Sequence, residues 1–221
     1  MITLISGWAT SSQCWTPLIE ALKDIGSIQT VDWYKLFGSD EALIDTSVCI
    51  GWSIGGVMAL QAAQKYQFEK CVLISTTPRQ IEDDNFSGAN LEMYKGLGQG
   101  IQYAREETLK QFCTMNLHPT KEHFDSLYEQ ALTIDQESLI KGLQFLEKTD
   151  LRKELSLIEC PSLVLHGTQD AITPFTSGEY LSSHLPNAKF IPIEGAGHAL
   201  PITHPKEIAA HIEEFLGGTH S

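Results

Sequence analysis

Short apolar runs alternate with amphipathic stretches along the first third of the chain. Two stretches between these runs, residues 14–25 and 54–66, have the composition and spacing of helices, and in the first of them Leu18, Ile19 and Leu22 recur at helical spacing. The apolar runs are short and typical of buried strands, at residues 1–5, 28–32, 47–51 and 70–75. This β-α-β alternation predicts a parallel sheet that is covered on both faces.

The pattern changes between residues 79 and 150, where no strand is indicated. Helical stretches follow one another there instead, at about residues 90–96, 106–114, 121–133 and 136–148. Strands and helices then alternate again: strands at 161–166 and 188–193, helices at 175–184 and from Pro205 to just before Gly217. We therefore predict an α/β core formed by residues 1–78 and 151–221, with about six mostly parallel strands, and an inserted α-helical lid formed by residues 79–150.

Composition and charge narrow the class of protein. The chain has 221 residues, of which 42% are apolar and 19% charged, and this composition excludes a disordered or fibrous chain. Acidic residues outnumber basic ones by 28 to 15, which argues against a nucleic-acid binder because such a protein needs a basic face. No apolar run reaches the roughly 18 residues of a membrane span, and the N-terminus lacks the basic region of a signal peptide. We expect a cytoplasmic protein and a monomer.

Five cysteines are scattered along the chain without a C-x-x-C motif. Their number is odd and their spacing fits neither a disulfide framework nor a zinc site. They are predicted to be small buried hydrophobic residues, and we expect no metal and no cofactor. These residues are Cys14, Cys49, Cys71, Cys113 and Cys160.

The strongest motif for chemistry is Gly51-Trp52-Ser53-Ile54-Gly55, which lies between a predicted strand and a predicted helix. In a G-x-S-x-G turn the chain reverses sharply, and small residues two before and two after the serine allow the close approach. The serine hydroxyl then stands exposed at a helix N-terminus. The motif predicts that Ser53 is a nucleophile, whereas an ordinary glycine-rich turn is the alternative.

Two further residues follow strands at the same edge of the predicted sheet. Asp170 comes just after the strand at 161–166, and His198 lies in a glycine-rich loop after the strand at 188–193. The carboxyl ends of parallel strands share one edge, so Ser53, Asp170 and His198 are expected to meet there. His198 can then act as general base and Asp170 can orient its imidazole. Asp150 and Glu194 are kept as alternative acids.

The segment Ser6-Gly7-Trp8 directly follows the first predicted strand and suits an oxyanion hole. The backbone N–H groups of Trp8 and Ile54 would hold the charge that develops on a substrate carbonyl oxygen. The Trp8 side chain can in addition pack against the lid.

Together these segments resemble the α/β-hydrolase superfamily over nearly the whole chain. They are Ser6-Gly7-Trp8, Gly51 to Gly56, His166-Gly167-x-x-Asp170-x-x-x-Pro174 and Gly195-Ala196-Gly197-His198. Within the superfamily, the Gly-Trp-Ser elbow, the segment Thr149 to Arg152 and the segment His198 to Pro205 are similar to the pimeloyl-[acyl-carrier protein] methyl ester esterases of biotin synthesis.

That resemblance implies a serine carboxylesterase with a Ser53–His198–Asp170 triad. Its substrate would be a pimeloyl methyl ester carried on acyl-carrier protein, from which the enzyme removes the methyl group. The resemblance also implies that Trp8 contacts the ester, and we expect Trp52 beside it in substrate binding.

The sequence departs from the family's pattern at several points. Ser6-Gly7 stands where many members have His-Gly, and the loop ends in Ala9 rather than glycine. Because the chain begins at the first predicted strand, the two N-terminal strands of the full fold are expected to be missing. Residues 79–150 hold seven basic and thirteen acidic side chains, although the family grips its acidic carrier with basic lid residues.

One basic strip remains a candidate contact for the carrier protein. Lys141, Lys148 and Arg152 recur at i, i+7 and i+11, and they would share one helical face if the helix at 136–148 continued. The alternative is an ordinary solvated face.

Two other classes of function stay open. The first is another hydrolase on this fold: a general or lactone esterase, a thioesterase or a carbon–carbon bond hydrolase. The second is a binding or sensor protein that no longer turns over its ligand. A haloalkane dehalogenase is disfavoured, because the nucleophile position of the G-x-S-x-G turn holds Ser53, whereas that enzyme needs an aspartate there.

Overall fold

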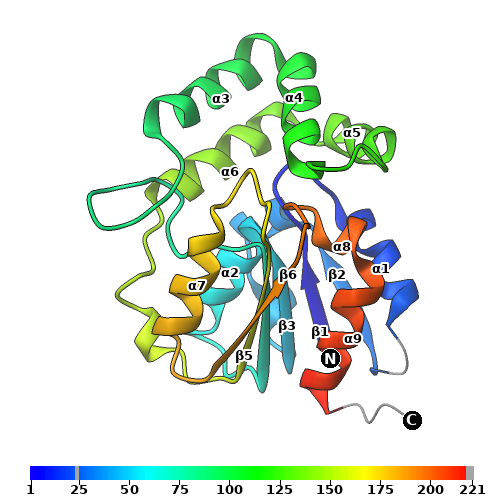
Figure 1. The fold of residues 1–221 in the computed structure, drawn as a ribbon, viewed down its shortest axis with the longest axis vertical. Helices are drawn as coiled ribbons and strands as arrows, with labels where there is room; N and C mark the ends of the chain where they lie inside the picture. Colours follow the sequence, from blue (N-terminus) through cyan, green and yellow to red (C-terminus); the bar gives the residue numbers. More distant parts are fainter. Residues whose placement is uncertain (23–24, 218–221) are drawn as a thin grey trace.

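Six strands form one parallel sheet in the order β2-β1-β3-β4-β5-β6, as the computed structural model shows for residues 1–22 and 25–217 (Figure 1). Their number and parallel pairing confirm the prediction from sequence. The strands are β1 (Ile2–Ile5), β2 (Ile28–Val31), β3 (Val48–Trp52), β4 (Lys70–Ile74), β5 (Ser162–Gly167) and β6 (Ala188–Ile193).

The central strands are apolar without alternation because helices cover both of their faces. Every residue of β1, β3 and β5 is buried, as expected for the middle of a parallel sheet. The strand β6 is only half-buried and carries Lys189 and Pro192, residues that suit an edge strand.

Helices flank the sheet on two sides. In Figure 1, α2 and α7 lie to the left of the strands, and α1, α8 and α9 lie to the right, near the N-terminus. These helices are α1 (Thr16–Ala21), α2 (Ile54–Ala62), α7 (Phe175–His184), α8 (Leu200–Thr203) and α9 (Pro205–Leu216).

The first helix differs from its prediction. The helix expected at 14–25 is divided into a 3₁₀ turn, η1 (Ser12–Trp15), and the short α1, which ends where Leu22 turns to extended backbone. Residues 23 and 24 of that prediction lie outside the described part of the chain. Two further 3₁₀ turns that the sequence did not indicate, η2 (Trp33–Phe37) and η3 (Glu41–Leu43), follow β2.

Four helices lie above the carboxyl edge of the sheet (Figure 1, top) and correspond to the predicted helical stretches. Asn90 and Asp135 cap α3 and α6, because their side chains accept hydrogen bonds from backbone N–H groups of the first turn. The segments that lead into and out of these four helices lie side by side and form an antiparallel β-bridge between Arg79 and Asp150. The helices are α3 (Leu91–Tyr103), α4 (Arg105–Leu117), α5 (Phe124–Thr133) and α6 (Gln136–Lys148).

The helix α3 runs well beyond the predicted end near residue 96. Its middle contains Gly96, Gly98 and Gly100, which weaken helix propensity. Packing explains why the helix persists: a Cβ on Gly100 would collide with the Thr108 side chain of α4. The glycine therefore allows α3 and α4 to approach closely, and tertiary contact outweighs propensity.

All five cysteines are free thiols, and four of them are buried as predicted. Burial raises the pKa of Cys14 and of Cys113 to about 12, so neither thiol is reactive at neutral pH. Among residues 1–22 and 25–217, no helix has the length and apolar character needed to cross a membrane.

Candidate active site

Ser53 occupies the sharp joint between β3 and α2. Its backbone lies at φ 56° and ψ −121°, a conformation that is strained for a residue other than glycine. The neighbouring glycines make the turn possible, since a Cβ on Gly51 would meet the backbone of Gly55 and a Cβ on Gly55 would meet the Ile5 carbonyl. The Ser53 side chain is thereby placed at the carboxyl edge of the sheet and at the N-terminus of α2.

Asp170 and His198 form a buried pair at the same edge. His198 Nδ1 lies 2.8 Å from Asp170 Oδ2. The other carboxylate oxygen, Oδ1, accepts hydrogen bonds from the backbone N–H groups of Ile172 and Thr173, each at 2.8 Å. These two bonds fix the carboxylate, and the pair leaves Nε2 as the imidazole nitrogen that faces away from the acid.

The pKa of Asp170 is set by opposing effects. Burial by itself raises this pKa, because a low-dielectric surrounding disfavours the charged form. The charge of His198 and the hydrogen bonds from His166 and His198 outweigh burial and hold the pKa well below the ordinary carboxyl range. Asp170 is therefore ionised at any pH at which the protein is expected to work.

A second histidine contacts the same carboxylate. His166 Nε2 lies 3.0 Å from the Thr173 carbonyl oxygen and 3.3 Å from Asp170 Oδ2, and the ring is fully buried. His166 ends the predicted strand at 161–166, and its position four residues before the acid, in the His166-Gly167-x-x-Asp170 segment, is the signal in the sequence that could have identified this contact.

The alternative acids lie elsewhere. Asp150 accepts hydrogen bonds from Arg79 and Arg152, each at 2.7 Å, where the helical segment leaves and rejoins the sheet. Glu194 accepts a hydrogen bond from Thr168 at 3.4 Å on the surface. The structure brings Asp170 to His198.

The predicted oxyanion loop is a tight turn after β1. Thr10 closes it by donating to the Gly7 carbonyl from its hydroxyl at 2.7 Å and from its backbone N–H at 3.2 Å. Ser6, which stands where many superfamily members have histidine, donates to the Thr10 carbonyl at 3.3 Å and accepts from the backbone N–H of Trp33 at 3.2 Å. The serine thus ties the loop to the segment after β2.

The backbone N–H groups of Trp8 and Ile54 are the predicted donors of the oxyanion hole. Ile54 is the first residue of α2, and the helix itself makes no use of its N–H group. Trp8 lies in the turn, next to Ala9 at a left-handed φ of 58°. Because β1 pairs with β3, the two N–H groups follow neighbouring strands at the carboxyl edge of the sheet.

The Trp8 side chain joins this loop to the helices above. Its indole N–H donates to the Leu139 carbonyl of α6 at 2.9 Å, and its ring meets Phe112 of α4 edge-on at 4.6 Å. Its predicted packing against the lid is present.

Trp52, which was predicted to bind substrate, packs against the histidine loop. Its side chain is fully buried with no exposed surface, and its indole N–H donates to the His198 carbonyl at 2.9 Å. Trp52 therefore contacts the loop that carries His198 from within the core.

The helices above the sheet also reach the histidine loop. The backbone N–H of Ala199 donates to the Asn116 carbonyl of α4 at 3.2 Å. A Cβ on Gly197 would collide with the His118 carbonyl, so only glycine fits there. The end of α4 thus covers the loop that carries His198.

The predicted basic strip is not one helical face. The helix α6 ends at Lys148 and Thr149 is extended, with ψ 127°, so the helix does not continue to Arg152. Arg152 instead bonds to Asp83 at 2.8 Å and to Asp150 at 2.7 Å. Lys141 pairs with Glu137 on its own helix.

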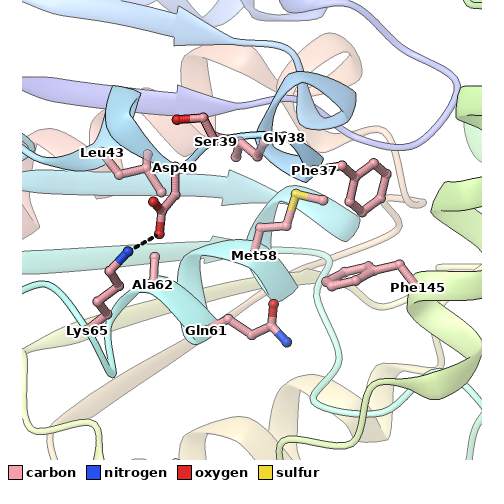
Figure 2. A pocket seen from close by; sticks show the side chains of 11 residues that line it. Phe37, Gly38, Ser39, Asp40, Leu43, Met58, Gln61, Ala62, Lys65 and Phe145 are labelled. Atoms are coloured by element: carbon pink, nitrogen blue, oxygen red, sulfur yellow. Dashed lines mark hydrogen bonds and ion pairs between the residues drawn. The ribbon is translucent and has the colours of Figure 1, made fainter.

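Two hollows flank the helical segment, and neither is lined by Ser53 or His198. One, of about 390 Å³, runs along α2 from Phe37 and Phe145 to the ion pair between Lys65 and Asp40 (Figure 2). The other, of about 490 Å³, lies between α5 and the start of α1, with Cys14, Gln130 and Ile202 among its walls.

Fold and site together define an α/β hydrolase, and residues 26–205 match the family model of the α/β hydrolase fold. The chain belongs to this family and is a hydrolase; the predicted fold class and resemblance are confirmed.

Among curated relatives, the chain is 27% identical over 230 residues to the pimeloyl-[acyl-carrier protein] methyl ester esterase of Legionella pneumophila, covering 97% of this chain and 94% of the relative. It is 28% identical over 239 residues to the protein of the same name from Xanthomonas campestris, with the same coverage. Among solved structures, a bromoperoxidase from Bacillus anthracis superimposes with a TM-score of 0.86 at 24% identity, over 97% of this chain and 91% of that one.

Proposed function

We propose that this protein is a serine esterase in which Ser53, His198 and Asp170 act as a triad. The observation that carries this proposal is the 2.8 Å hydrogen bond between His198 Nδ1 and Asp170, at the sheet edge that holds the Ser53 elbow. It fixes the imidazole tautomer so that Nε2 is free to accept a proton. The backbone N–H groups of Trp8 and Ile54 stabilise the oxyanion that forms during acyl transfer.

The reaction takes place in two halves. His198 Nε2 takes the Ser53 hydroxyl proton while Oγ forms a bond to the ester carbonyl carbon, and the N–H groups of Trp8 and Ile54 hold the oxyanion. The carbon–oxygen bond to the alcohol then breaks, and the imidazolium gives its proton to the leaving oxygen. A water molecule, deprotonated by His198, next attacks the acyl-enzyme and releases the acid, and the proton returns to Ser53.

The substrate we propose is a pimeloyl methyl ester on acyl-carrier protein. Both curated relatives described above carry that activity in their names, and each is matched over 97% of this chain. The first half of the reaction would then release methanol and leave the pimeloyl chain on Ser53. The enzyme would act in biotin synthesis, with the carrier protein as its partner.

Two experiments test this proposal. The gene should restore growth without biotin to a bacterium that lacks its own pimeloyl methyl esterase, and the Ser53→Ala variant should not. Purified protein should release methanol from pimeloyl-[acyl-carrier protein] methyl ester without cleaving the thioester to the carrier. Growth rescue by Ser53→Ala would refute the serine mechanism, and cleavage at the thioester would make the protein a thioesterase.

A free small-molecule ester is a second candidate substrate. Two of the three basic residues predicted to contact the carrier protein already have acidic partners. Arg152 bonds to Asp83 and Asp150, and Lys141 pairs with Glu137. This observation favours a free ester. If the enzyme hydrolyses free dimethyl pimelate as efficiently as the carrier-bound ester, this candidate is preferred.

A further inference from the structure

The four tryptophans are all buried but differ in what their indole N–H groups contact. Trp15 and Trp33 have no acceptor for this group among the described residues. Trp8 and Trp52 each donate to a backbone carbonyl at 2.9 Å, on Leu139 and His198 respectively. The two bonded indoles are the two that border the proposed oxyanion and histidine loops.

Trp52 touches three parts of the proposed site. It directly precedes Ser53 in the chain and is the last residue of β3. Its ring lies against the oxyanion loop, where a Cβ on Gly7 would come within 2.9 Å of indole Cε3. Its ring centroid lies 5.9 Å from that of His198. No other indole in the chain has contacts with both loops among those the structure records.

The His198 backbone is fixed from two directions. Its carbonyl accepts the indole N–H of Trp52 at 2.9 Å and the backbone N–H of Leu200 at 3.0 Å. On the other side, the N–H of Ala199 donates to Asn116 of α4. Trp52 is therefore the contact from the sheet, and α4 supplies the contact from the helices above.

We propose that Trp52 is a positioning residue that sets the position of His198 relative to Ser53. It acts through the His198 backbone and touches neither the substrate nor the reacting atoms. Because Trp52 is covalently joined to Ser53 and hydrogen-bonded to His198, movement of the nucleophile and of the base is coupled. Small displacements of reacting groups, of about 1 Å, can lower rates about 100-fold, so a single buried hydrogen bond is sufficient for this role.

The inference rests on the proposed esterase function for its kinetic test. Trp52→Phe removes the N–H donor and keeps an aromatic ring, whereas Trp15→Phe makes the same change at an indole whose N–H has no acceptor. We expect Trp52→Phe to lower kcat about 10- to 100-fold with KM changed less than about twofold, since the group acts on the chemical step rather than on binding. Trp15→Phe should leave both constants within about twofold of the wild type.

A second readout is independent of the ester substrate. A fluorophosphonate should label Ser53 more slowly in Trp52→Phe, by a factor similar to the fall in kcat. Proton NMR of the His198–Asp170 hydrogen bond should show a displaced Nδ1–H signal in Trp52→Phe and an unchanged signal in Trp15→Phe. Trp52→His, which retains a ring N–H, should recover part of the loss and carries the test if the phenylalanine variant does not fold.

Three results would overturn the inference. Equal kcat and equal labelling in Trp52→Phe and Trp15→Phe would make Trp52 a packing residue only. A raised KM with unchanged kcat would return it to substrate binding. An unchanged Nδ1–H signal would show that the His198 position does not depend on the indole. Absence of labelling in the wild type refutes the esterase function instead, and the NMR comparison still decides the role of Trp52.

Discussion

Asp170 and Asp150 both have lowered pKa values, but their surroundings differ. At the sheet edge, the Asp170 side chain is fully buried and its partners are His198 and His166. Where the helical segment joins the sheet, Asp150 is partly exposed and bonds to Arg79 and Arg152, and the hydrogen bond from Arg152 is the main cause that lowers the pKa of Asp150 to about 2. A histidine can accept and release a proton near neutral pH, whereas an arginine stays charged.

This difference separates the carboxylate proposed for catalysis from a structural one. A lowered pKa is common to both aspartates and therefore does not identify the acid. The partner does, because Asp170 bonds to His198, the base of the proposed triad, whereas Asp150 bonds to arginines. Asp150 instead closes a cluster with Asp83 and two arginines that fastens the ends of the helical segment to each other.

The largest effect is expected at the nucleophile. Ser53→Ala should lower kcat for ester hydrolysis by about 10⁴-fold or more, because no other group on this sheet edge replaces the hydroxyl. Thermal unfolding should change little, since the hydroxyl is not part of the packed core. A short p-nitrophenyl ester provides the assay. Near-full activity in the variant would place the chemistry elsewhere in the molecule.

Matched aspartate variants test the comparison directly. Asp170→Asn should slow turnover by roughly 10²- to 10⁴-fold, because an amide can hold the imidazole in the wrong tautomer. Asp150→Asn should leave kcat within about twofold, since its partners are arginines. Steady-state kinetics on both proteins checks this, together with a melting curve for each. Reversed results would move the acid to Asp150.

How much of this site the sequence could predict depends on the distance of each contact along the chain. The elbow at Ser53 and the acid at Asp170 could be predicted because glycines and strand ends nearby in the sequence define them. The contact of Trp52 with His198 joins residues 146 positions apart, and the fastening of Arg152 to Asp83 joins residues 69 apart. No local pattern encodes such pairs.

The same limit explains the errors in the fold. The six strands were predicted because buried parallel strands are short apolar runs bounded by polar residues. The length of α3 was not predicted, since Gly100 fits against Thr108 on the neighbouring helix α4. The predicted basic strip depends on α6 continuing beyond Lys148. The helix ends at Lys148, and Asp150 and Arg152 bond to each other where the helical segment rejoins the sheet.

The acid dependence of stability tests the arginine cluster at Asp150. The pKa of Asp150 is lowered in the folded protein, so below about pH 4 the unfolded chain binds more protons than the folded chain. Stability supplied by the cluster is therefore complete above about pH 4 and lost as the pH falls toward 2. Melting temperatures from pH 6 to 2.5 should fall less steeply in Asp150→Asn than in the wild type.

At neutral pH the same variant should be slightly less stable. Exposed ion pairs contribute about 0–1 kcal/mol, which corresponds to a fall of up to about 4 °C in Tm for a chain of this size. An identical pH slope in the two proteins would show that the arginine cluster adds nothing to stability.

The smallest expected effect concerns the carrier protein. Of the three predicted basic contacts, Lys148 ends α6 and is exposed, whereas Lys141 and Arg152 have acidic partners. Lys148→Glu should therefore raise KM for a carrier-bound methyl ester about two- to fivefold, as expected for an exposed charge, and leave the free methyl ester unaffected. The effect should diminish with added salt, because exposed charges are screened over about 10 Å at 0.1 M. Lys206→Glu, at an exposed lysine of α9, is the control for added negative charge. Equal KM changes in the two variants would attribute the effect to net charge, and no change in either would remove Lys148 from the carrier contact and favour a free ester as substrate.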